Sequence, residues 1–236
     1  KSTSTTNDGF LAFSFFLTEM TVPTRMSILS KSSKVICSFI NLIYNKNLNM
    51  STENNSELLF DNSVKILTDL IGFKTISGED NTSLIDYCDD ILKKLGATSF
   101  RTYDDEKKRV NLFATLKAKS SNNKKPIILS GHTDVVPVSK GWSSDPFTAT
   151  VKGDKLYGRG SCDMKGFIAC ALAYAPIFSK SNLDRDIHFS FTFDEETACQ
   201  GAPILIEELK KRDIKDGICI IGEPTNMKII DAHKGC

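Results

Sequence analysis

The sequence predicts an α/β domain in which a mixed, largely parallel sheet is flanked by helices. Two observations support this class. Strand-like and helical segments alternate along the chain, and several strand-like segments are continuous apolar runs that suit a buried sheet. No internal repeat is visible.

Four segments carry the spacing of apolar residues that is typical of helices. The first ends near Gly72. The second is expected to have Thr82 or Ser83 as its N-cap and Gly96 beyond its last turn. The third is strongly apolar, whereas the fourth ends in lysines and arginine. The expected helices span residues 56–73, 82–96, 164–178 and 202–212.

Strands are expected in the segments between these helices. Two of them, PIILSGH and GICIIGEP, are apolar runs of a buried strand, and DIHFSFTFDEE alternates. A hairpin is expected over residues 147–160, turning at Gly153 and Asp154. The expected single strands span residues 110–117, 126–132, 186–196 and 217–224.

Composition narrows the class of protein. The 236 residues are 40% hydrophobic and 25% charged, with a formal net charge of +1, which is ordinary for a soluble globular protein. This balance favours a small metabolite over nucleic acid or an acidic membrane as partner. The seven cysteines include no C-x-x-C pair, so a zinc knuckle and a thioredoxin-type motif are unsupported, and a reducing cytoplasm is expected.

The stretch 1–49 differs from the rest of the chain. It is rich in Ser, Thr and Asn, and its apolar runs at 10–17 and 35–44 are shorter than the roughly 18 residues that span a bilayer. We expect a poorly ordered leader there and a folded unit over 50–236; a signal peptide would need a small-residue cleavage site, which does not follow. Because the chain starts with Lys1 and stops after an apolar run, we expect a piece of a longer reading frame.

Acidic residues and one histidine follow the apolar strands at the points where these strands end. In open α/β sheets, ligands bind beyond the carboxyl ends of the strands, so these side chains are expected at one rim. A further acid stands at the start of an apolar helix. The residues are His132 and Asp134, Glu195 and Glu196, Glu223, and Asp163 before the helix.

Gathering these carboxylates is costly unless a cation offsets their repulsion. One imidazole among carboxylates suits zinc, cobalt or manganese better than calcium. Asp134, two residues after His132, is expected on the same face and is a candidate to orient the imidazole. Each motif alone has an ordinary explanation, such as a surface turn, a solvated helix start or an N-cap. The joint pattern, with a spacing of about 30 residues that suits successive βα units, favours a metal site.

These residues lie in stretches that resemble the metallo-exopeptidase and deacylase family containing acetylornithine deacetylase, succinyl-diaminopimelate desuccinylase and aminoacylases. The resemblance covers approximately Glu57 to the carboxyl end. The matching stretches are SGHTDVVPV (130–138), GWSSDPFTA (141–149), KLYGRGSCDMKG (155–166), FTFDEETACQGA (191–202) and IGEPTNMKIIDAHKG (221–235).

The resemblance implies a zinc-exopeptidase-like catalytic domain with two divalent metal ions, zinc or cobalt. It implies His132 and Glu223 as ligands of the first ion, Asp163 as the bridging carboxylate and Glu196 as a ligand of the second ion. Glu195 is similar to the family's general base, and Asp134 to the residue that orients the histidine. A cis peptide bond is also implied after Asp163.

The implied reaction is hydrolysis of an N-acylated amino acid. GWSSDPF, YGRGSCDMKGF and AHKG most resemble the acetylornithine deacetylases, which implies conversion of N-acetyl-L-ornithine to L-ornithine and acetate in arginine biosynthesis. The alternatives within the family are a desuccinylase and an aminoacylase or carboxypeptidase. The resemblance also implies that the full-length protein is a homodimer.

The chain departs from the family pattern in two respects. It ends before the distant histidine that completes the family's second metal site, and neither His188 nor His233 is assigned as its replacement. We also expect the family's lid and dimerisation domain to be absent from it. We therefore expect this chain to bind one metal ion and to turn over poorly or not at all.

Two rival classes remain. A non-catalytic metal-binding relative is possible, although a free carboxylate at Glu195 beside Glu196 argues against it. A cysteine hydrolase that uses Cys162 is disfavoured, because the adjacent Asp163 would raise the pKa of the thiol.

Overall fold

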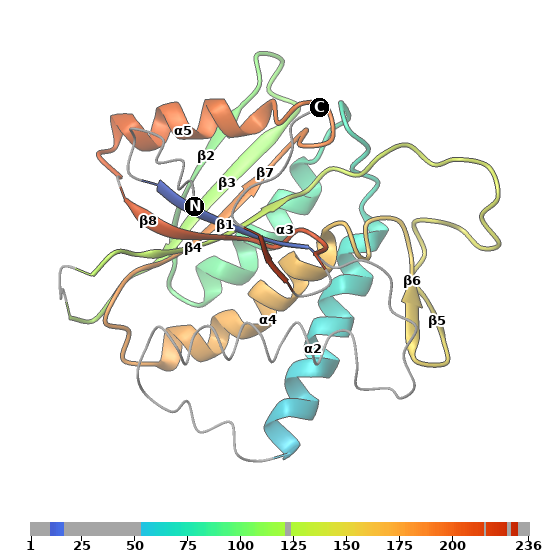
Figure 1. Cartoon of the computed structure of the whole chain (residues 1–236), viewed down its shortest axis with the longest axis horizontal. Coiled ribbons are helices and arrows are strands. Elements are labelled where there is room, and N and C mark those ends of the chain that lie inside the picture. Colours follow the sequence, from blue (N-terminus) through green and yellow to red (C-terminus); the bar gives the residue numbers. More distant parts are fainter. Residues whose placement is uncertain (1–9, 17–52, 121–123, 215, 226–227, 231–236) are drawn as a thin grey trace.

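The computed structural model describes residues 10–16, 53–120, 124–214, 216–225 and 228–230. These residues form a seven-stranded sheet with helices on both faces, and a separate two-stranded hairpin (Figure 1). The strands are β1 (Phe10–Phe16), β2 (Thr98–Tyr103), β3 (Val110–Leu116), β4 (Ile127–His132), β5 (Thr150–Lys152), β6 (Lys155–Tyr157), β7 (Ile187–Thr192), β8 (Gly217–Ile221) and β9 (Lys228–Ile230). The helices are α2 (Glu53–Gly72), α3 (Thr82–Lys94), α4 (Lys165–Lys180) and α5 (Gly201–Lys211).

The seven strands run in the order β2-β3-β7-β4-β8-β1-β9. The central pairings β7–β4, β4–β8 and β8–β1 are parallel. The outer pairings β2–β3, β3–β7 and β1–β9 are antiparallel. The expected mixed sheet is confirmed, with its parallel part at the centre.

The helices divide between the two faces of the sheet. α5 contacts β2, β3 and β7 on one face (Figure 1). On the other face, α3 contacts β3, α4 contacts β4, and α2 packs against α4. Successive residues of β3 point to opposite faces. Phe113 therefore packs with Leu205 and Leu209 of α5. Leu112 and Ala114, which point the other way, join the larger core under α3 and α4.

Most of the expected elements are confirmed within a few residues. The hairpin β5–β6 turns at Gly153 and Asp154. Strand β7 was expected to alternate in exposure, but its residues from Ile187 to Phe191 are all buried, because it lies between β3 and β4 with helices on both sides. Strand β2 was not expected at all.

The N-cap of α3 is Asn81, not Thr82 or Ser83. The Asn81 side chain makes no capping hydrogen bond. Its NH₂ group instead donates to Val110 O and to Thr133 Oγ1, each at a distance of 2.9 Å. Its carbonyl oxygen accepts a hydrogen bond from Val110 N. Asn81 thus joins the start of α3 to the start of β3 and to the residue that follows β4.

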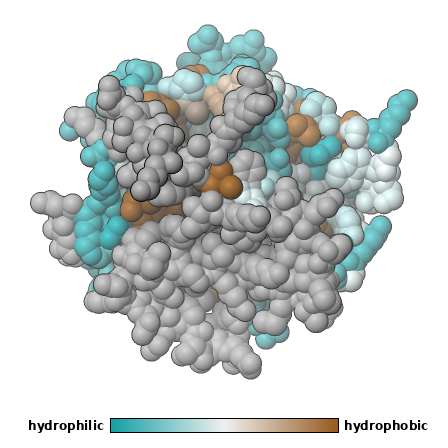
Figure 2. Space-filling model, in the orientation of Figure 1, coloured by the Kyte–Doolittle hydropathy of each residue, from teal (hydrophilic) through white to brown (hydrophobic). Residues whose placement is uncertain are grey.

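Within the stretch 1–49, only Phe10–Phe16 is described, as strand β1 paired with β8 and β9. The rest lies outside the described residues, so the expectation of a leader stays a prediction for the stretch as a whole. Among the described residues, no helix is both long and apolar enough to cross a bilayer. Figure 2 shows hydrophilic residues along much of the described periphery in this view, consistent with an apolar interior.

Candidate metal centre

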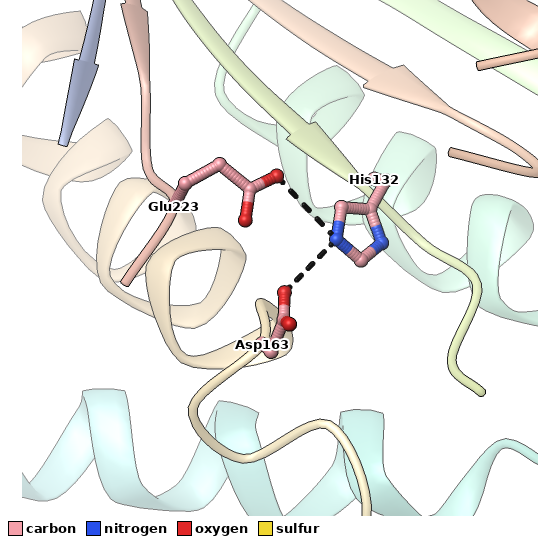
Figure 3. A group of neighbouring side chains, drawn as sticks. All are labelled: His132, Asp163 and Glu223. Carbon is pink, nitrogen blue, oxygen red and sulfur yellow. Dashed lines mark hydrogen bonds and ion pairs between the residues drawn. The ribbon is translucent and has the colours of Figure 1, made fainter. Parts of the chain in front are cut away.

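Three of the predicted ligands converge beyond the carboxyl ends of the central parallel strands. His132 is the last residue of β4, Glu223 follows β8, and Asp163 precedes α4. Because β4 and β8 are parallel neighbours, their carboxyl ends meet at one edge of the sheet. One ligand atom from each of the three residues lies within 4.8 Å of the others (Figure 3).

The two ring nitrogens of His132 have different partners. Nδ1 lies 2.9 Å from the backbone carbonyl oxygen of Asp134. Since a carbonyl can only accept, Nδ1 carries a proton and donates it. Nε2 faces the carboxylates, 3.1 Å from Asp163 Oδ1 and 3.5 Å from Glu223 Oε1 (Figure 3). Nε2 is thus the nitrogen available to a cation.

The acids around His132 perturb one another. Burial alone would lower the pKa of His132, but hydrogen bonds with Asp134 and Asp163 and the charge of Glu223 outweigh it and raise the pKa to about 11. The hydrogen bond with His132 is the main cause that lowers the pKa of Asp163. Burial, together with the charges of Asp163 and Glu195, raises the pKa of Glu223 to about 8.

This arrangement fits a divalent cation. A proton on Nε2 reduces the repulsion between the imidazole lone pair and two carboxylates, and a cation in the same position would do so more fully. The donor set of one imidazole and two carboxylates is one that zinc and similar ions accept. His132, Asp163 and Glu223 would hold such an ion.

Glu195 lies beside this cluster but is turned partly to solvent. Its Oε2 is 3.8 Å from His132 Nε2, and its side chain is 40% exposed. Its Oε1 lies 3.7 Å from Cys199 Sγ. A carboxylate in this position can reach a water molecule near the imidazole.

Glu196 is not part of the three-residue cluster. It lines, together with Asp163, a cavity of about 160 Å³. Burial, and then the charge of Asp163, raises the pKa of Glu196. Glu196 and Asp163 are thus electrostatic neighbours on one cavity wall, as a shared second ion would require.

Asp134 contacts both His132 and the loop that carries Glu195 and Glu196. Its carboxylate lies 3.5 Å from His132 Nδ1, which is longer than the bond to its own backbone carbonyl. The same carboxylate accepts hydrogen bonds from Ser77 Oγ at 2.7 Å and from the backbone N–H groups of Glu195 at 3.0 Å and Glu196 at 3.3 Å. The predicted orienting contact is therefore made mainly by the backbone of Asp134, while its side chain fixes the loop carrying both glutamates.

Two further buried charged residues, Asp194 in this loop and Lys165 at the start of α4, were not found from the sequence. Asp194, 1% exposed, accepts hydrogen bonds from Gly78 N and from Arg109, which also pairs with Asp104. Lys165, fully buried, donates to the backbone carbonyls of Leu70 at 3.0 Å and Phe73 at 2.8 Å. These partners are distant in sequence, and nothing local in the sequence indicates them.

The structure also bears on the predictions made for His188, for Cys162 and for the peptide bond after Asp163. His188 is buried in β7, where its Nδ1 lies 2.9 Å from Thr115 Oγ1, so it is a core residue. Desolvation and the charge of Asp163 raise the pKa of Cys162, which favours the unreactive thiol. The expected cis peptide bond joins Asp163 and Met164. His233 lies outside the described residues.

Comparison with known proteins agrees with this geometry. The chain is 39% identical over 176 residues to succinyl-diaminopimelate desuccinylase of Rickettsia akari, covering 71% of this chain and 45% of that protein. It is 35% identical over 182 residues to acetylornithine deacetylase of Erwinia tasmaniensis, covering 74% of this chain and 46% of that protein. The chain therefore spans less than half the length of these relatives.

Solved structures share the fold. The M20 family metallo-carboxypeptidase Sso-CP2 from Sulfolobus solfataricus has a TM-score of 0.59 at 23% identity, over 67% of this chain and 36% of that one. Human carnosine dipeptidase 1 has a TM-score of 0.58 at 21% identity, over 83% of this chain and 41% of that one. Residues 128–233, which contain the metal-site cluster, match the sequence profile of peptidase family M20/M25/M40. The chain therefore contains a catalytic-domain segment of the M20/M25/M40 peptidase family.

Proposed function

We propose that this chain is part of a metal-dependent hydrolase that cleaves the amide bond of an N-acylated amino acid, with N-acetyl-L-ornithine as the favoured substrate. The observation that carries the proposal is the approach of three ligand atoms, from His132, Asp163 and Glu223, to within 4.8 Å of one another. Glu195 lies 3.8 Å from the same imidazole nitrogen, so a free carboxylate stands next to the ligands.

The residues would divide the work as follows. His132, Asp163 and Glu223 hold the first ion, and Asp163 with Glu196 contributes to a second. When bound, such an ion polarises the acyl carbonyl and acidifies a neighbouring water molecule. Glu195 would take a proton from that water on its carboxylate as the water oxygen bonds to the acyl carbon. It would then pass the proton to the amine nitrogen as the C–N bond breaks. Asp134 keeps Nδ1 of His132 protonated, so that Nε2 remains a ligand.

A second candidate is hydrolysis of an N-succinylated amino acid. It is supported by the relative from Rickettsia akari, which is named a desuccinylase and shares 39% identity with this chain. The two candidates require the same ligands and the same general base. They differ in the acyl group, so the substrate panel below separates them. A homodimer, a cytoplasmic location and a role in arginine biosynthesis belong to the same proposal.

The decisive experiment measures bound metal and hydrolysis together on the purified chain. Zinc and cobalt are titrated calorimetrically into the metal-free protein, and release of free amine is followed with N-acetyl-L-ornithine and N-succinyl-LL-diaminopimelate. We expect binding of at least one ion per chain and slow hydrolysis that a chelator abolishes. Hydrolysis that survives chelation would refute the metal mechanism. Faster hydrolysis of the succinyl compound would refute N-acetyl-L-ornithine as the favoured substrate.

A matched pair of variants controls this experiment. Glu223→Gln should weaken metal binding because it removes one anionic ligand oxygen. Glu208→Gln changes a glutamate on α5 that pairs with Arg212 on the surface and should leave the metal affinity unchanged. Equal loss in both variants would mean that the metal binds through general surface charge.

A further inference from the structure

One arginine lies on the wall of the cavity that Asp163 and Glu196 line. Arg159 belongs to the loop between β6 and α4, four residues before Asp163, and contributes to the cavity of about 160 Å³. The segment that supplies a predicted metal ligand therefore also supplies a permanent positive charge.

Arg159 differs from the other arginines of the described residues. Arg101, Arg109, Arg185 and Arg212 each form an ion pair with at least one aspartate or glutamate. Arg159 forms none with any described carboxylate within 4.0 Å. Its Nη2 donates to the backbone carbonyl of Pro137 over 3.3 Å, and its guanidinium lies 5.2 Å from the centre of the Trp142 ring.

The guanidinium is also incompletely hydrogen-bonded. Its Nε is buried and has no hydrogen-bond partner among the described residues, although a guanidinium offers five donors in a planar fork. Trp142 lies against the group and limits the orientations of this plane. A carboxylate is the ligand that fits such a fork, because it accepts two parallel hydrogen bonds.

We propose that Arg159 is the binding residue for a carboxylate of the substrate, and that it selects N-acyl amino acids that carry this carboxylate over analogues that lack it. The inference rests on the proposed function for its choice of ligand. The other charged groups on the cavity wall are the carboxylates of Asp163 and Glu196, whose charge a bound cation would offset. Arg159 is the cationic side chain of this wall and therefore attracts the anionic end of the substrate.

The carboxylate has two possible origins, which the same test distinguishes. It is either the α-carboxylate of the amino acid or the terminal carboxylate of a succinyl group. Three ligands separate them: N-acetyl-L-ornithine carries only the α-carboxylate, its α-carboxamide carries none, and the α-carboxamide of N-succinyl-L-ornithine carries only the acyl carboxylate.

Binding is measured by fluorescence, because Trp142 is the chain's one tryptophan and its ring lies next to the Arg159 guanidinium. Each ligand is titrated into the zinc-loaded chain and, separately, into the chain with chelator, with calorimetry as a second readout. We expect one of the two carboxylate ligands to bind at least about tenfold more tightly than the ligand that lacks a carboxylate. The preferred ligand identifies the source of the carboxylate.

Substitutions test whether this preference belongs to Arg159. Arg159→Met should reduce the preference to less than about twofold, and Arg159→Lys should retain part of it, since lysine keeps the charge but loses the planar fork. The matched control is Arg212→Met, which removes another arginine that stacks on a ring, that of Phe100 at 4.0 Å, on the far side of the sheet at the end of α5. The control should leave the preference unchanged.

The outcomes separate this inference from the proposed function. A preference that is unchanged in folded Arg159→Met or Arg159→Lys, or equal binding of all three ligands to the original chain, would overturn the carboxylate site. If carboxylate-dependent binding is lost in Arg159→Met while hydrolysis is insensitive to chelation, the inference stands and the metal mechanism fails. Circular dichroism of each variant establishes that the comparison is made on folded protein.

Discussion

The backbone N–H of Glu195 donates a hydrogen bond of 3.0 Å to the carboxylate of Asp134. Because the backbone carbonyl of Asp134 also accepts from His132 Nδ1, one residue links the predicted metal ligand to the predicted general base. The distance between the imidazole of His132 and the carboxylate of Glu195 therefore depends on Asp134.

Replacing Asp134 should disturb both partners. In Asp134→Asn, an amide NH₂ would face at least one of the donors from Ser77, Glu195 and Glu196, so we expect the free energy of unfolding to fall by about 1–3 kcal/mol. Turnover and metal affinity should fall as well. Urea denaturation and metal titration measure these effects, and Ser77→Ala, which removes a single donor, should cause a smaller loss in each.

Glu195 should separate turnover from metal binding. Glu195→Gln removes the proton acceptor but is not expected to remove a ligand of the three-residue cluster. We expect kcat to fall by roughly 10²–10⁴-fold, with an unchanged number of zinc ions per chain. Loss of zinc together with activity would instead make Glu195 a ligand.

Gly222 should tolerate no side chain. A Cβ at this position would lie 1.9 Å from the ring of Phe167 on α4, and the displacement would move the adjacent Glu223. We expect Gly222→Ala to lower the melting temperature and weaken metal binding. The control is Gly72→Ala at the end of α2, where a Cβ would meet nothing within 4 Å; equal effects of the two variants would contradict the structural explanation.

Arg109 should stabilise the loop that precedes Glu195. It pairs with Asp104 and with Asp194, whose side chains are 6% and 2% exposed. Arg109→Met would leave two buried carboxylates without this cation, so we expect a loss of about 3 kcal/mol in the free energy of unfolding. A double variant with Asp104→Asn should be less destabilised than the sum of its parts, which denaturant titrations would measure.

His188 should make stability depend on pH. Burial lowers the pKa of His188 from 6.5 to about 4 in the folded chain, against the charge of Asp186 and helped by that of Lys117. Between these values the unfolded chain binds more protons, so the contribution of His188 is lost as the pH falls from 6.5 towards 4. The loss is about 2 kcal/mol between about pH 6.5 and pH 5.

A non-titrating residue should remove this dependence. We expect the difference in unfolding free energy between the original chain and His188→Gln to shift in favour of the variant as the pH is lowered to about 5. Thr115→Val, which removes the partner of Nδ1 but keeps the imidazole, should retain the dependence. An identical pH profile for His188→Gln and the original chain would show that folding does not lower the pKa of His188.

The apolar periodicity was sufficient to predict α2, α4, α5 and the buried strands, because each of these elements packs its apolar residues into one of the two hydrophobic clusters beside the sheet. Strand β2 escaped prediction because TSFRTY is neither an apolar run nor an alternating one, and its position at the sheet edge leaves most of it partly exposed. The N-cap of α3 was predicted wrongly because the side chain of Asn81 makes tertiary hydrogen bonds and no capping bond.

The ligands of the predicted site could be found from the sequence because strand ends in a parallel sheet lie at one edge, which places His132 and Glu223 together. The residues that orient them could not. The partners of Asp134 and Asp194 lie as far as 116 positions away in the chain. Contacts at such a separation cannot be predicted from the local pattern of a single sequence. The unpaired guanidinium of Arg159 likewise becomes evident only when its surroundings are known.

The cluster draws its members from β4, from the segment before α4 and from the segment after β8, so no single hairpin or helix can assemble it. An ion held there would cross-link three parts of the chain, and its retention would favour the assembled sheet by mass action. The visible absorption of cobalt could thus serve as an optical gauge of assembly. It should vanish at the same denaturant concentration at which β4 and β8 separate.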